Sequence, residues 1–129
     1  MTGLETALAG LRLALDSPRR RRTWRALVRQ RMQAVHAALE LQPVRGDAEE
    51  PEIWLAGRAC TLERDRVALT TRLAVLGPLL THAPDVETVL PDVRRLLVDL
   101  EHHRQRLDDL VYDAVSLELG GSDLSLIHI

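Results

Sequence analysis

Six arginines near position 20 have the residue type and spacing to bind an anion. Four are consecutive, and two more follow at steps of three and four, so on a helix they form one ridge. A helix N-terminus, where we expect the ridge to begin, itself attracts negative charge. The sequence therefore predicts a site for a phosphate group or an acidic partner at Arg19, Arg20, Arg21, Arg22, Arg25 and Arg29.

Two readings of this arginine ridge stay open at the sequence level. Three carboxylates that begin the last helix, Asp85, Glu87 and Asp92, lie at the same end of an up-down-up bundle and would neutralise the ridge. A free ridge would instead bind a partner. Nucleic acid is the less favoured partner, because the chain has a pI of about 6.2 and only 2% aromatic residues for stacking bases.

A second cluster has metal-ligand character. Asp99 and His102 share a helix face, so two ligands could converge there, and a metal-dependent activity is the second alternative function. Two ligands are too few for a stable metal site, and a second copy of the Asp-x-x-His spacing does not occur. His103 falls in an apolar seam, where we expect a buried hydrogen bond that fixes helix register.

The sequence offers little for catalysis. Cys60 is the only cysteine and has no histidine near it in sequence to activate it, and glycine-rich phosphate loops and nucleophile elbows do not occur. We therefore expect a protein that is not an enzyme and needs no cofactor. The single thiol and a longest uncharged stretch of about 12 residues predict a cytoplasmic protein without a membrane helix.

Helical elements must position these residues. Leucines at helical spacing predict a short first helix ending near Asp16, and Ser17-Pro18 predicts the start of a second helix that ends before Pro43. A third helix is expected from Pro51 to a stop at Gly77-Pro78. The fourth and longest helix is expected to end at Gly120-Gly121, with Pro91 either bending it or marking its start.

The last two expected helices carry seams with coiled-coil spacing. One polar residue, Arg66, interrupts the third helix's seam, and Glu101 or Asp108 of the fourth helix is its expected partner. A second apolar register widens the face of the fourth helix beyond one seam, so this helix is expected to touch two neighbours. Its members are Val86, Leu90, Val93, Leu97, Leu100, Leu107, Val111 and Ala114.

These patterns predict an all-α fold: an antiparallel three-helix up-down-up bundle with a short additional N-terminal helix. Residues 1–121 are expected to form one domain and 122–129 a disordered or non-native tail. The stretch EHHRQRLDDLVYDAVSLELGGSD, residues 101–123, resembles the C-terminal end of small, uncharacterised all-helical proteins of high-GC bacteria. That resemblance covers about a fifth of the chain and implies no activity.

Charge is distributed unevenly along the chain. Residues 1–45 carry nine arginines and three acidic residues, whereas 46–129 carry eight arginines and sixteen acidic residues. The leading hypothesis is a non-enzymatic adaptor or regulatory module that acts through the broad apolar face of the fourth helix, with a protein partner or a second copy of itself.

Overall fold

The computed structural model describes residues 3–19, 23–41 and 53–127, with side chains in the last segment from Trp54 to Leu117. Within these residues the chain forms helices and no strand, so the predicted all-α fold class is confirmed for this part. None of the described helices is long and apolar enough to cross a membrane. The elements are α1 (Gly3–Asp16), α2 (Trp24–Leu41), α3 (Ile53–His82), a 3-10 turn (Val86–Thr88) and α4 (Leu90–Ile127).

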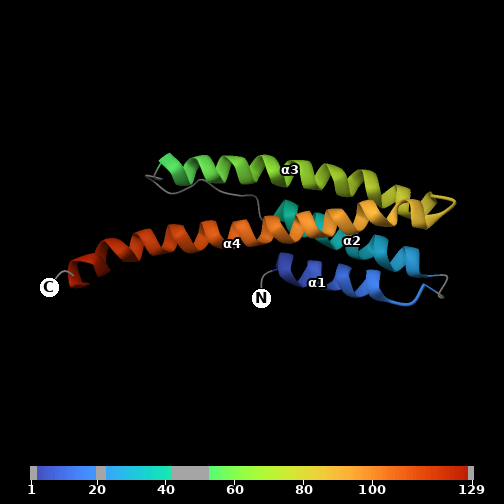
Figure 1. The fold of residues 1–129 in the computed structure, drawn as a ribbon, viewed down its shortest axis with the longest axis horizontal. Coiled ribbons are helices and arrows are strands. Elements are labelled where there is room, and N and C mark those ends of the chain that lie inside the picture. Colours follow the sequence, from blue (N-terminus) through green and yellow to red (C-terminus); the bar gives the residue numbers. More distant parts are fainter. Residues whose placement is uncertain (1–2, 20–22, 42–52, 128–129) are drawn as a thin grey trace.

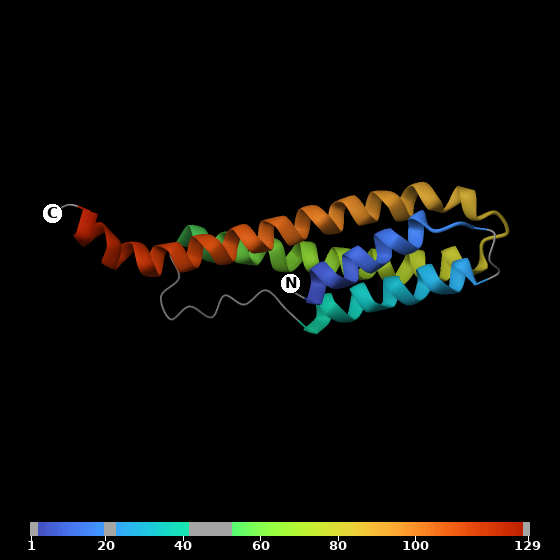
Figure 2. The ribbon, with the colours of Figure 1, turned by 90° about the horizontal axis from the view of Figure 1, so that it is seen from below.

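The four helices lie along one long axis, and each runs antiparallel to the one before it (Figures 1 and 2). Each helix contacts its successor in the chain, and α1 also contacts α4. The first helix therefore packs along α2 and α4. Both views show α3 and α4 continuing together beyond the ends of α1 and α2.

The buried side chains divide the molecule into two regions. A large cluster draws on all four helices, with Leu11, Val28, Leu73 and Leu100 among its members. A small cluster contains only residues of α3 and α4, namely Leu55, Ala59, Leu62 and Leu110. We call residues 53–62 of α3 and 107–117 of α4 the arm, and the described residues 3–19, 23–41 and 63–106 the four-helix half.

The second helix begins later than predicted. Ser17 belongs to the end of α1, because its backbone N–H donates to the Ala14 carbonyl at 3.2 Å and its hydroxyl donates to the Leu13 carbonyl at 2.8 Å. The first helical turn of α2 starts at Trp24, which is buried and donates its indole N–H to Ala14 at 3.0 Å. Burial of this indole and its bond to the end of α1 outweigh the capping signal of Ser17-Pro18.

The third helix does not stop at Gly77-Pro78, as the sequence analysis expected, but continues to His82. An interior proline removes one hydrogen bond and costs about 3 kcal/mol. Continuing the helix buries Leu80 completely, and burial of a leucine offsets about 1.5–3 kcal/mol of that cost. The predicted start of this helix at Pro51 lies outside the described residues.

The fourth helix begins at Leu90, so the second of the two predicted alternatives, that Pro91 marks the start of this helix, is confirmed. Pro91 occupies its first turn, where a missing N–H costs nothing. The Asp85 carboxylate accepts the Glu87 backbone N–H at 3.0 Å and so caps the 3-10 turn ahead of it. The predicted stop at Gly120-Gly121 is wrong, because α4 runs through both glycines to Ile127.

Candidate functional site

The arginine ridge begins outside a helix. Arg19 lies in the connection between α1 and α2, not in the first turn of α2 as predicted. It forms an ion pair with Glu87, and its guanidinium lies over the Trp24 ring, 5.6 Å from the centroid. One of the three carboxylates expected to neutralise the ridge therefore pairs with this arginine.

Two further members of the ridge bind other parts of the chain. Arg25 donates from Nη1 to the Ala83 carbonyl at 2.5 Å and to the Thr81 carbonyl at 3.4 Å, so it satisfies carbonyl groups at the end of α3. Arg29 lies against Gly77, where a Cβ would come within 3.0 Å of the guanidinium. Gly77 thus allows close approach of an arginine and does not end a helix.

The other ridge residues, Arg20, Arg21 and Arg22, lie outside the described residues. Of the six predicted site residues, the structure therefore places Arg19, Arg25 and Arg29, and all three have interactions within the chain. These arginines join the α1–α2 connection and α2 to the 3-10 turn and the end of α3.

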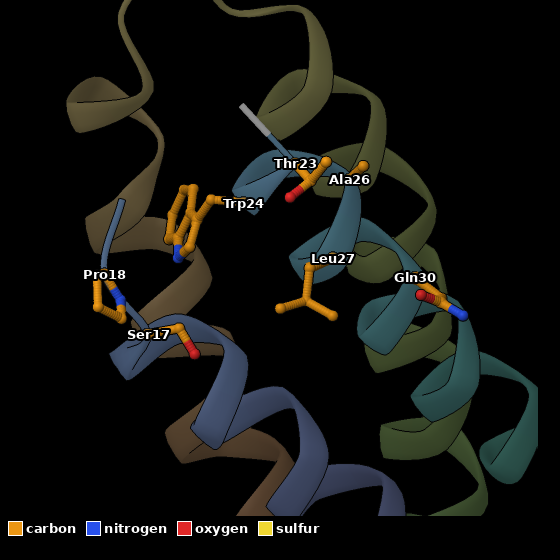
Figure 3. Close-up of a pocket in the computed structure, with 7 residues that line it drawn as sticks. All are labelled: Ser17, Pro18, Thr23, Trp24, Ala26, Leu27 and Gln30. Atoms are coloured by element: carbon orange, nitrogen blue, oxygen red, sulfur yellow. The ribbon is translucent and has the colours of Figure 1, made fainter. Parts of the chain in front are cut away.

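A pocket of about 520 Å³ lies beside this connection. Figure 3 shows Ser17 and Pro18 from the end of α1 facing Trp24 and Leu27 of α2. The remaining lining residues are Thr23, Ala26 and Gln30. The described lining includes the hydroxyl groups of Ser17 and Thr23, but it contains no acidic or basic side chain that could activate them for nucleophilic attack.

The α3–α4 pair carries a ladder of three ion pairs. The residue numbers of each pair sum to 171, so all three report one antiparallel register. The charges alternate: arginine comes from α3 in the first and third pairs and from α4 in the second. The pairs are Arg58 with Asp113 at 2.7 Å, Asp65 with Arg106 at 3.0 Å, and Arg72 with Asp99 at 2.7 Å.

His103 is the buried polar residue of the α3–α4 seam. Its ring is fully buried, and Nδ1 lies 2.7 Å from Oδ2 of Asp65, the carboxylate that also accepts from Arg106. An ionised carboxylate only accepts, so Nδ1 carries the proton and donates. The Nε2 atom is buried without a hydrogen-bond partner in the described structure. The expected buried hydrogen bond at this position is confirmed.

The arrangement around Asp99 is that of an ion pair. Its carboxylate accepts a hydrogen bond from Arg72, while His103, in the apolar seam, is hydrogen-bonded to Asp65. Across the described residues, no group of three or more His, Cys, Asp and Glu side chains could hold a metal ion. A groove between two rungs of the ladder is lined by Asp65, Arg72, Asp99, His102, Gln105 and Arg106.

Arg66 does not pair with α4, contrary to the sequence-based expectation. It donates to Glu63, one turn earlier on its own helix, from Nε at 2.8 Å and from Nη2 at 2.5 Å. This hydrogen bond raises the pKa of the Arg66 guanidinium. The expected partners are engaged elsewhere, because Glu101 pairs with Arg12 of α1 and Asp108 with Arg104.

The broad face of α4 is covered over only part of its length. Val93 and Leu97 are 0% and 8% exposed, and on this side of α4 Arg94, Glu101 and Arg104 pair with residues of α1. Val111 and Val115 lie 18 positions further along, about five turns, and so occupy the same helix face. They are 61% and 47% exposed, because α1 does not extend over the arm.

The second apolar register of α4 is thus buried over one part of the helix and exposed over another. Leu90, Val93, Leu97 and Leu100 are buried against this chain's own helices, whereas Val111 remains exposed. Val115, Tyr112 and Trp54, also exposed on the arm, were not among the predicted site residues. The five-turn spacing from Leu97 to Val115 was the sequence signal that could have identified Val115.

Comparisons with known proteins return no match from protein-family models, curated proteins or solved structures.

Proposed function

We propose that this protein is a non-enzymatic helical interaction module whose contact surface is the exposed apolar face of α4 in the arm. The observation that carries the proposal is the contrast between Val93 and Leu97, which are buried, and Val111 and Val115, which lie on the same face and are exposed. A contiguous exposed apolar patch, unlike single exposed apolar residues, marks a surface for contact with another molecule.

We further infer the bundle architecture behind this surface. Three long antiparallel helices in up-down-up order, with the N-terminal helix packed against the second and fourth, account for the contacts of α1 with α2 and α4. In this arrangement α1 and α2 cover the α3–α4 pair only in the four-helix half. The arm then projects as a two-helix extension available to another molecule.

The charge arrangement supports this proposal over an anion site at the arginine ridge. Arg19 has a carboxylate partner, and Arg25 donates to backbone carbonyls, so an anion would have to compete with existing bonds. The exposed face of the arm has no such competition at Val111 and Val115, which are apolar.

Photocrosslinking from the face tests the proposal. A photoreactive residue at position 111 in the full chain, expressed in its native host, should give a defined crosslinked product. The matched control is position 98, because Val98 is 49% exposed on α4 but lies in the four-helix half, away from the covered face. Equal crosslinking from both positions, or none from position 111, would contradict the proposed surface.

A further inference from the structure

We draw no further inference here: the strongest candidate, the exposed apolar surface patch of α4 in the arm at Val111 and Val115, belongs to the site already described, and nothing in the structure shows what covers it.

Discussion

The four-helix half and the arm differ in how many helices cover the same α4 face. Val93 in one region and Val111 in the other occupy equivalent positions, yet the first is fully buried and the second is 61% exposed. Local sequence is apolar at both sites, so periodicity alone does not determine burial. The difference depends on the length of α1 and α2, which end before the arm begins.

The largest expected effect is a loss of stability that differs between the buried clusters of the two regions. Leu100→Ala, at a fully buried position of the four-helix half, should lower the free energy of unfolding by about 2–5 kcal/mol. Leu110→Ala in the arm should cost about 2 kcal/mol or less, because only two helices surround it and the site can collapse. Urea denaturation of both variants measures this, and equal losses would contradict the division into two cores.

The hydrogen bond between His103 and Asp65, which lies in the four-helix half next to the arm, should be the next most sensitive. Asp65→Ala leaves the buried Nδ1–H of His103 without its acceptor and should cost about 1–3 kcal/mol. Asp65→Asn keeps a carbonyl oxygen and should cost less. Thermal unfolding compares the two variants, and hydrogen exchange should show faster exchange in the arm of Asp65→Ala. Unchanged exchange there would show that this bond does not stabilise the adjoining arm.

A smaller effect is expected where α2 caps α3. Arg25→Ala removes the bonds to the Thr81 and Ala83 carbonyls and should lower stability by about 1–2 kcal/mol. Arg95→Ala, on an exposed position of α4, is the control for loss of an arginine. Chemical denaturation measures both, and equal effects would mean that Arg25 acts only through its charge.

The ladder should make the smallest contribution to stability. Arg72 and Asp99 are each more than a third exposed, so a double-mutant cycle to alanine should give a coupling of about 0.2–1 kcal/mol. The same cycle on Arg58 and Asp113 in the arm should give a value of similar size. A coupling well above this range in either region would contradict the view that solvent screens the ladder.

Sequence reasoning identified the helices because their apolar positions repeat at helical spacing. It identified His103 as a buried hydrogen-bonding residue for the same reason: its position lies in the seam. It misplaced the start of α2 and the end of α3, because Ser17-Pro18 and Gly77-Pro78 are local signals. Tertiary contacts of Trp24, Leu80 and Arg29 outweigh those signals.

The candidate site was harder to predict than the fold. The ridge arginines could be found by charge, but their partners depend on which helix ends meet in space. Arg66 illustrates this limit, since the nearest carboxylate proved to be on its own helix. The exposed face of the arm was predicted only in part, because sequence shows which face is apolar and not where the covering helix ends.

The alternating charges of the ladder specify how α3 is aligned with α4, although each ion pair contributes little to the free energy of folding. If α3 slid against α4 by seven residues in one direction, Arg58 would meet Arg106 and Asp65 would meet Asp99. Sliding in the opposite direction would set Arg72 beside Arg106 and Asp65 beside Asp113. Hydrophobic seams that repeat every seven residues tolerate such shifts, whereas these charges penalise both, so weak surface bonds specify one alignment of the hairpin.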